Sequence, residues 1–144
     1  MQSNVQRRMR GVTLIELLTV LAVLAILSAL AVSTYRGHLV RTNRTDATAT
    51  LLRVQVAQEK YFLQNNVYAD DVTTKLGFAS DTTPQGIYRV TLAAASGSDF
   101  ATSYVATATA LGTQRSSDPQ CQTLTIDDKG QRGSNPGASS TCWR

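Results

Sequence analysis

The chain has 144 residues, 42% of them hydrophobic, which suits one small domain and an additional apolar segment. The formal net charge is +4, but three arginines stand within residues 1–11, which contain no acid. Without that segment, 11 basic and 10 acidic side chains remain. A chain so close to neutral offers no global electrostatic attraction for nucleic acid.

A long apolar stretch, residues 12–32, follows these arginines without a proline. Its polar residues are Thr13, Glu16, Thr19 and Ser28. At 1.5 Å per residue a helix of this length spans about 31 Å, close to the hydrocarbon thickness of a bilayer. We therefore expect a transmembrane helix over residues 12–33 and a separate head over residues 34–144. The preceding arginines predict a cytoplasmic amino terminus and an outward-facing head.

Glu16 is the one acid in the apolar stretch. An ionised carboxylate in a membrane is costly without a partner, and no basic residue lies between Val12 and Tyr35. The counter-charge could come from a neighbouring subunit, or from an amine on Val12 after cleavage behind Gly11. Glu16 could instead be protonated, or reach interfacial water.

The segment from Arg10 to Glu16, followed by apolar residues, closely resembles the leader of type IV prepilins. In that family a membrane aspartyl peptidase cleaves after the glycine and methylates the new amino terminus, and the glutamate aligns subunits during assembly. The resemblance implies a cleaved leader over residues 1–11, with cleavage between Gly11 and Val12. It further implies N-methylation of Val12 and an assembly role for Glu16.

The chain departs from most pilins at three positions. Val12 stands where phenylalanine is usual, Ser33 where many pilins have proline, and no glycine lies near Ala25. Whether the helix melts locally on assembly is therefore left open. The same leader also occurs in the pseudopilins of type II secretion.

The two cysteines, Cys121 and Cys142, lie in the part expected outside the membrane, where conditions are oxidising. We predict a disulfide between them that stabilises the fold by about 3 kcal/mol. A metal site is the alternative, but two cysteines and the distant His38 do not make a zinc set. The adjacent acids Asp70 and Asp71 lack the spaced ligand series of a calcium loop, so no cofactor is expected.

The pattern remains helical from residue 34 to about residue 64, with two apolar stripes. One carries Val40, Ala47, Leu51, Val54, Tyr61 and Phe62, and the other Ala49, Leu52, Val56 and Leu63. Two stripes indicate two packing partners, the head's own sheet and neighbouring subunits, although burial within one domain would also account for them. The arginines of this segment are expected on a solvated face: Arg36, Arg41, Arg44 and Arg53.

Alternating patterns predict strands over residues 87–94, 100–111 and 121–126, with a short fourth strand from residue 131 to 133. Residues 127–130, Asp-Asp-Lys-Gly, predict the turn between the last two strands. The serine pairs at 116–117 and 139–140 are expected in loops. Four antiparallel strands packed on the helix would give an α+β head.

This order of elements is similar to the pilin fold: a long amino-terminal helix, a four-stranded antiparallel sheet and a carboxy-terminal disulfide loop. The head resembles minor pilins of the PilE type and the ComP-type pilins that serve DNA uptake. The resemblance is carried by the segments Gln58 to Phe62 and Cys121 to Ile126, and by the closing Cys142-Trp143.

No nucleophile with a partnered base, phosphate loop or metal motif indicates an enzyme. The resemblance implies a pilus subunit that supports assembly, twitching motility and adhesion. Its partners would be major and minor pilins, prepilin peptidase, the inner-membrane assembly machinery and, before assembly, membrane lipid. It would stand in the inner membrane with a periplasmic head, and then in the extracellular pilus.

Two alternatives are kept. One is a pilus-displayed DNA receptor whose phosphate contacts are Arg115, Lys129, Arg132 and Arg144. Trp143 could stack on a base, although Asp118, Asp127 and Asp128 share that region. The other alternative is a pseudopilin of type II secretion.

Overall fold

The structure is a computed structural model that describes residues 12–144, with the side chains of residues 32–34 left out. The chain divides into two units, one ending at Gly37 and one running from His38 to Arg144. Helix α1, Leu14–Asn65, contributes to both. The predicted leader, with Gly11, lies outside the described residues.

The first unit presents its apolar side chains to the surroundings. Every residue from 12 to 31 is exposed, including Leu14 at 76% and Ile26 at 64%. By length and composition α1 can cross a membrane, as the apolar stretch predicts. So much exposed apolar surface requires a cover of lipid or protein.

The second unit contains a four-stranded antiparallel sheet in the order β1-β2-β3-β4. The strands are β1 Tyr88–Ala93, β2 Val105–Ala110, β3 Cys121–Asp127 and β4 Arg132–Pro136. The predicted fold, a long helix with a four-stranded antiparallel sheet, is confirmed. The turn at residues 127–130 is also confirmed, and there Gly130 has a φ of 72°.

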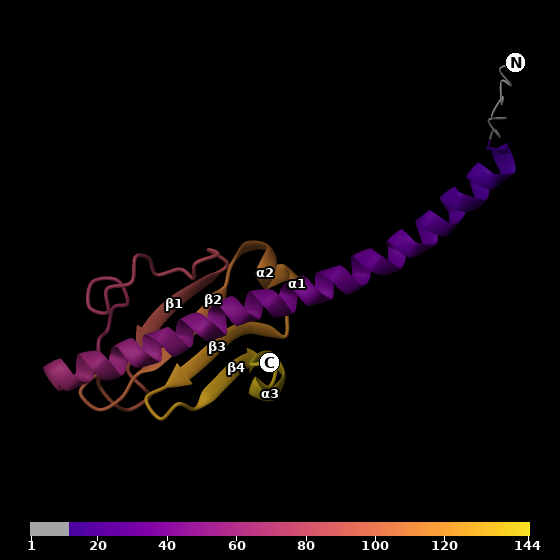
Figure 1. The fold of residues 1–144 in the computed structure, drawn as a ribbon. Helices are drawn as coiled ribbons and strands as arrows, with labels where there is room; N and C mark the ends of the chain where they lie inside the picture. The colour runs from indigo at the N-terminus through magenta and orange to yellow at the C-terminus, as the bar shows by residue number, and fades with distance from the viewer. Residues whose placement is uncertain (1–11) are drawn as a thin grey trace, which may run out of the picture. The chain divides into compact units, whose positions relative to one another are not determined.

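Helix α1 crosses one face of this sheet (Figure 1). Ala47, Leu51 and Val54 are fully buried in a core that includes the alanines of β2, Ala106, Ala108 and Ala110. Alanines on the facing strand allow the helix close to the sheet, because a methyl group fills little space. The stripe on the far side of α1 is exposed, with Val56 at 71% and Leu63 at 83%.

The structure corrects three local expectations. The second strand begins at Val105 rather than at residue 100, because residues 100–102 form a turn in which Asp99 accepts a hydrogen bond from the Ala101 amide. The two serine pairs are helical rather than in loops, in α2 Gly112–Ser117 and α3 Ser139–Cys142. Neither short helix has a side-chain N-cap, so both depend on tertiary contacts.

Helix α1 ends as predicted, at Asn65, and Asn66 follows with a φ of 53°. The chain after it is held by Gln58, which is fully buried. The side-chain amide of Gln58 donates through Nε2 to the Ala69 carbonyl and accepts through Oε1 from the Ala69 backbone N–H, each at 2.8 Å. This pair of bonds fixes the return of the chain towards the sheet.

Candidate functional site

The carboxy-terminal segment is joined to the sheet by the predicted disulfide between Cys121 and Cys142. The two sulfurs are 1.99 Å apart, the Cα atoms are 5.6 Å apart, and both residues are fully buried. Gly137 lies beside this bond, where an added Cβ would stand 3.4 Å from the Cys142 sulfur. The backbone amide of Gly137 donates to the Gln120 carbonyl at 2.7 Å, so the segment is tied back to the start of β3 by two links.

Trp143, directly after the disulfide, is held in a defined orientation. Its indole Nε1 donates to the Gly133 carbonyl of β4 at 2.8 Å. An added Cβ at Gly133 would collide with the Thr125 side chain on β3, so this strand position has no room for a larger residue. Trp143 packs against the core and remains partly exposed.

Arg132 lies over Trp143. The central guanidinium carbon is 5.1 Å from the centroid of the indole ring, within the range of a cation–π interaction. Arg132 is exposed and, among residues 12–144, has no carboxylate partner. Two adjacent residues of β4 thus contact Trp143: Arg132 through its guanidinium and Gly133 through its carbonyl.

The structure brings together some of the four predicted DNA-binding residues. Lys129 lies in the β3–β4 turn, Arg132 begins β4, and Arg144 follows Trp143. Arg115 and Arg144 lie towards the opposite end of β3, Arg115 in α2, which leads into that end, and Arg144 just after Cys142, which is bonded to Cys121 there. A strand of seven residues separates these ends by about 20 Å.

The described ion pairs of the head leave all four residues free. They join Arg44 to Asp118, Lys75 to Asp70 and Arg89 to Asp81. The nearby Asp127 is occupied by its own turn, because its Oδ1 accepts from the backbone amides of Lys129 at 3.0 Å and Gln131 at 2.7 Å. The cations near this turn can therefore reach an external anion.

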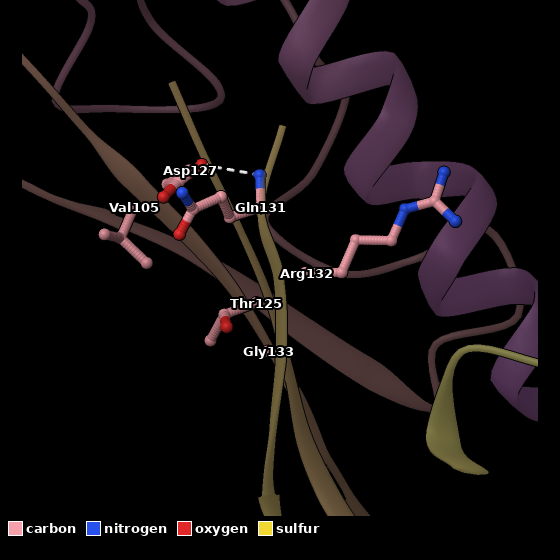
Figure 2. Close-up of a pocket in the computed structure, with 6 residues that line it drawn as sticks. All are labelled: Val105, Thr125, Asp127, Gln131, Arg132 and Gly133. Atoms are coloured by element: carbon pink, nitrogen blue, oxygen red, sulfur yellow. Dashed lines mark hydrogen bonds between the residues drawn. The ribbon is translucent and has the colours of Figure 1, made fainter. Parts of the chain in front are cut away.

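A shallow pocket of about 210 Å³ lies beside the same turn. It is lined by Val105, Thr125, Asp127, Gln131, Arg132 and Gly133. Figure 2 shows the guanidinium of Arg132 directed away from the other lining side chains. The guanidinium of Arg132 therefore lies apart from the other lining side chains, among them Asp127, although Arg132 itself borders the pocket.

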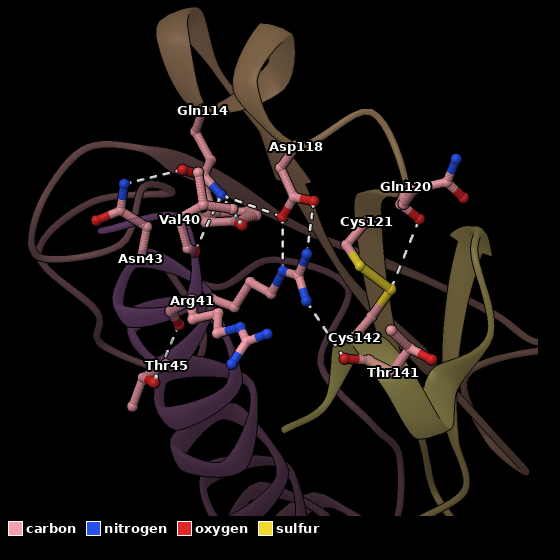
Figure 3. Close-up of polar contacts among 12 residues, drawn as sticks. Val40, Arg41, Asn43, Thr45, Gln114, Asp118, Gln120, Cys121, Thr141 and Cys142 are labelled. Carbon is pink, nitrogen blue, oxygen red and sulfur yellow. Dashed lines mark hydrogen bonds and ion pairs between the residues drawn. A yellow bond between two sulfur atoms is a disulfide. The ribbon is translucent and has the colours of Figure 1, made fainter. Parts of the chain in front are cut away.

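A buried polar network, which sequence patterns do not reveal, anchors α2 to α1 (Figure 3). Arg44 donates through Nε and Nη2 to the two carboxylate oxygens of Asp118, each at 2.7 Å, and through Nη1 to the Thr141 carbonyl at 3.3 Å. The side chain of Asp118 is 3% exposed. The hydrogen bonds that Arg44 donates to Asp118 raise the pKa of Arg44 above its ordinary value.

The expectation of a solvated face is therefore wrong for Arg44, which is bound by an acid 74 residues away. Gln114 completes the network, and it is 2% exposed. It accepts from Asn43 at 2.8 Å and donates to the Tyr88 hydroxyl at 3.0 Å. Through these hydrogen bonds Gln114 holds the short, polar helix α2 against both α1 and the sheet.

Glu16 occupies the third position of α1, after Thr13. The Thr13 Oγ1 accepts a hydrogen bond from the Glu16 amide at 3.3 Å, which is half of a capping box. Within residues 12–144 no ion pair joins Glu16. The carboxylate also lies near the positive end of the helix dipole, a local stabilisation that the sequence pattern Thr-x-x-Glu could have indicated.

No set of three or more His, Cys, Asp or Glu residues in residues 12–144 is close enough to hold a metal ion.

Comparison with known proteins gives matches along most of the chain. Residues 33–125 match the family model described as type IV minor pilin ComP, DNA uptake sequence receptor. Residues 6–32 match the prokaryotic N-terminal methylation motif. A type IV pilin from Shewanella oneidensis is similar in structure, with 23% identity and a TM-score of 0.48, over 69% of this chain and 96% of that chain. A search of curated proteins gives no match.

The methylation motif, the long apolar helix and the disulfide-closed α+β head define a type IV pilin. Within that class, the chain belongs to the ComP family of minor pilins.

Proposed function

We propose that this protein is a minor subunit of a type IV pilus that binds duplex DNA at the filament surface. The proposal is supported by the family match over the head, since that family is described as a DNA uptake sequence receptor. The observation that carries it is Arg132, an unpaired and exposed arginine held on an aromatic ring beside Lys129. Adhesion and twitching motility would be properties of the filament into which the subunit is built.

The route into the filament follows from the amino-terminal motif. We propose that prepilin peptidase cleaves between Gly11 and Val12 and that Val12 is methylated. Glu16 then pairs with the amino terminus of a neighbouring subunit during assembly. Before assembly the subunit stands in the inner membrane, with a cytoplasmic amino terminus and a periplasmic head.

The DNA contact is expected at the end of the sheet that holds the β3–β4 turn. Lys129 and Arg132 would contact one stretch of duplex, because they lie in and directly after the same turn. Arg144 follows the disulfide to the start of β3, so it would contact the backbone towards that other end of the strand. Arg115, about one strand length away, would contact the backbone further along or take no part. A small, local group of cations is sufficient although the head as a whole is near neutral, because each phosphate contact releases counterions independently.

The test uses the processed full-length protein in neutral detergent, with fluorescence anisotropy of a labelled duplex across a salt series. We expect affinity to fall with salt, and the slope of log K against log salt to decrease by about 0.9 for each phosphate contact removed. Lys129→Ala and Arg144→Ala should each reduce the slope by about that amount.

Arg53→Ala is the matched control, because Arg53 is an exposed cation on α1 with no ion-pair partner among residues 12–144. It should leave the slope unchanged. Absence of binding at low salt, or an equal effect of Arg53→Ala, would contradict the proposal.

A further inference from the structure

We infer that Arg132 is the residue that reads DNA sequence, by contacting the major-groove edge of a guanine, whereas Lys129 contacts phosphate. The inference rests on the proposed DNA-binding function and assigns separate tasks within that site. It follows from how differently the structure holds these two cations.

The guanidinium of Arg132 lies over the Trp143 ring, with its central carbon 5.1 Å from the ring centroid. A cation–π contact is made by the charge and does not use up the N–H donors of the guanidinium. No carboxylate within residues 12–144 takes these donors. A planar pair of parallel donors matches the O6 and N7 acceptors of guanine, which is the commonest specific contact between a protein and DNA.

The ring beneath Arg132 is itself fixed from two sides. Its Nε1 donates to the carbonyl of Gly133, the residue that follows Arg132 in β4. Its backbone follows Cys142, which is bonded to Cys121 at the start of β3. Both attachments lead to neighbouring strands of one sheet, so the arginine is positioned by rigid elements. A base edge can be read only by donors held in such a defined geometry.

Lys129 differs in each respect. It lies in a turn, is exposed, and has no aromatic or acidic partner among the described residues. Its ammonium is a compact point charge on a flexible stem, without the planar fork that distinguishes one base from another. A cation of this kind positions DNA through phosphate and carries no sequence information.

The experiment begins with selection from a random-sequence duplex library, using the processed full-length protein in neutral detergent. The enriched duplex and a scrambled duplex of equal length are then compared in binding competition. Each guanine of the enriched duplex is replaced in turn by 7-deazaguanine, which lacks the N7 acceptor.

We expect Arg132→Lys to keep the low-salt affinity for the scrambled duplex, with an unchanged salt slope, and to lose the preference for the enriched duplex. The expected loss is about tenfold to a hundredfold. One 7-deazaguanine position should produce a similar loss in the wild-type protein and no further loss in Arg132→Lys. Lys129→Ala should weaken binding to both duplexes by the same factor and retain the preference.

Retained preference in Arg132→Lys, or lost preference in Lys129→Ala, would overturn the inference. Binding by the wild-type protein without any preference would also overturn it, while leaving the proposed DNA binding intact. Failure of the wild-type protein to bind any duplex would instead remove the proposed function itself. The near-ultraviolet circular dichroism of Trp143 and the intact disulfide establish that each variant is folded.

Discussion

Two buried tyrosines of the head differ in whether the hydroxyl group has a hydrogen-bond partner. Tyr88 and Tyr104 are both fully buried. The Tyr88 hydroxyl accepts a hydrogen bond from Gln114, whereas the Tyr104 hydroxyl is the one buried side-chain polar atom without a partner among the described residues. Burial raises the pKa of both tyrosines, since the charged form loses its hydration.

Replacing Tyr104 by phenylalanine should leave stability at pH 7 within about 1 kcal/mol, because an unpaired buried hydroxyl contributes little. At alkaline pH the variant should be the more stable protein. An unfolded tyrosine has a pKa near 10, and burial raises the pKa of Tyr104 in the folded state. The folded protein therefore binds the proton more tightly, and stability that is complete below pH 10 is lost as the pH rises above it.

Thermal unfolding between pH 8 and pH 11.5 measures this difference. Tyr61→Phe is the control, because Tyr61 is only partly buried and lies on α1. Identical alkaline profiles for the wild type and Tyr104→Phe would contradict the expectation.

The Arg44–Asp118 pair joins the residue that follows α2 to α1. Its two side chains are 13% and 3% exposed, so removal of one partner leaves a charge that water solvates poorly. Asp118→Asn should lower the free energy of unfolding by about 3 kcal/mol. Urea unfolding of the full chain in neutral detergent, followed by the fluorescence of Trp143, is the measurement.

The exposed pair of Lys75 and Asp70 provides the comparison, with side chains 41% and 51% exposed. Lys75→Met should not change the urea midpoint measurably, because water already solvates both charges. Equal changes in the urea midpoint for the two substitutions would show that burial of the Arg44–Asp118 pair does not increase its contribution to stability.

At the scale of elements, the head consists of one extensive apolar contact, between α1 and the sheet, and several short segments attached to it. The buried side of α1 faces a row of alanines on β2, and this contact forms the centre of the core. Helices α2 and α3 have six and four residues, too few to be stable alone. The network of Gln114 stabilises α2, and the disulfide holds α3.

Removal of the disulfide should therefore affect the carboxy-terminal segment first. The double variant Cys121→Ala/Cys142→Ala should lose about 3 kcal/mol of stability. It should also lose the fixed environment of Trp143, seen as a weaker near-ultraviolet circular dichroism signal. A reductant should have the same effect on the wild type and none on the double variant. Unchanged Trp143 signals after complete reduction would contradict this account.

At the scale of the whole molecule, the chain joins an exposed apolar helix to a folded head. Burial among neighbouring subunits in place of lipid gives little hydrophobic gain, because lipid tails are already apolar. Packing and charge pairing must then decide incorporation into a filament. Glu16 is the acid in a position to provide that pairing within the exposed stretch.

We expect Glu16→Ala to remain in the membrane fraction and to be absent from sheared pili. Thr19→Ala is the control, because Thr19 is another exposed polar residue of the same helix and donates only to the Glu16 carbonyl, at 2.9 Å. The mass of the membrane-extracted Glu16→Ala protein reports whether leader removal continues. Normal amounts of Glu16→Ala in sheared pili would rule out the assembly role.

Much of the fold was predictable from periodic patterns. The alternation in β1 and β3, the Asp-Asp-Lys-Gly turn and the end of α1 at Asn65 are local properties, set by strand pleat, turn chemistry and helix period. The second strand was predicted to begin too early, at residue 100, because the capping of the turn there by Asp99 outweighs a short alternating pattern. The helical state of the serine pairs has no local signal at all.

The candidate site divides in the same way. Residue type and compartment were sufficient to predict the disulfide between Cys121 and Cys142. They were also sufficient to select Lys129 and Arg132 as exposed cations. They could not show that Arg132 lies over Trp143, that Arg115 lies at the other end of a strand, or that Arg44 is buried against Asp118.

The sequence by itself determined the apolar helix, its single acid and the antiparallel hairpins, because each depends on composition or on spacing within a few residues. The class of protein came from the resemblance of the leader to that of type IV prepilins. The tertiary structure alone decided which cations are free and which are neutralised. That outcome depends on pairs such as Arg44 and Asp118, 74 residues apart, which meet only when the sheet closes over α1.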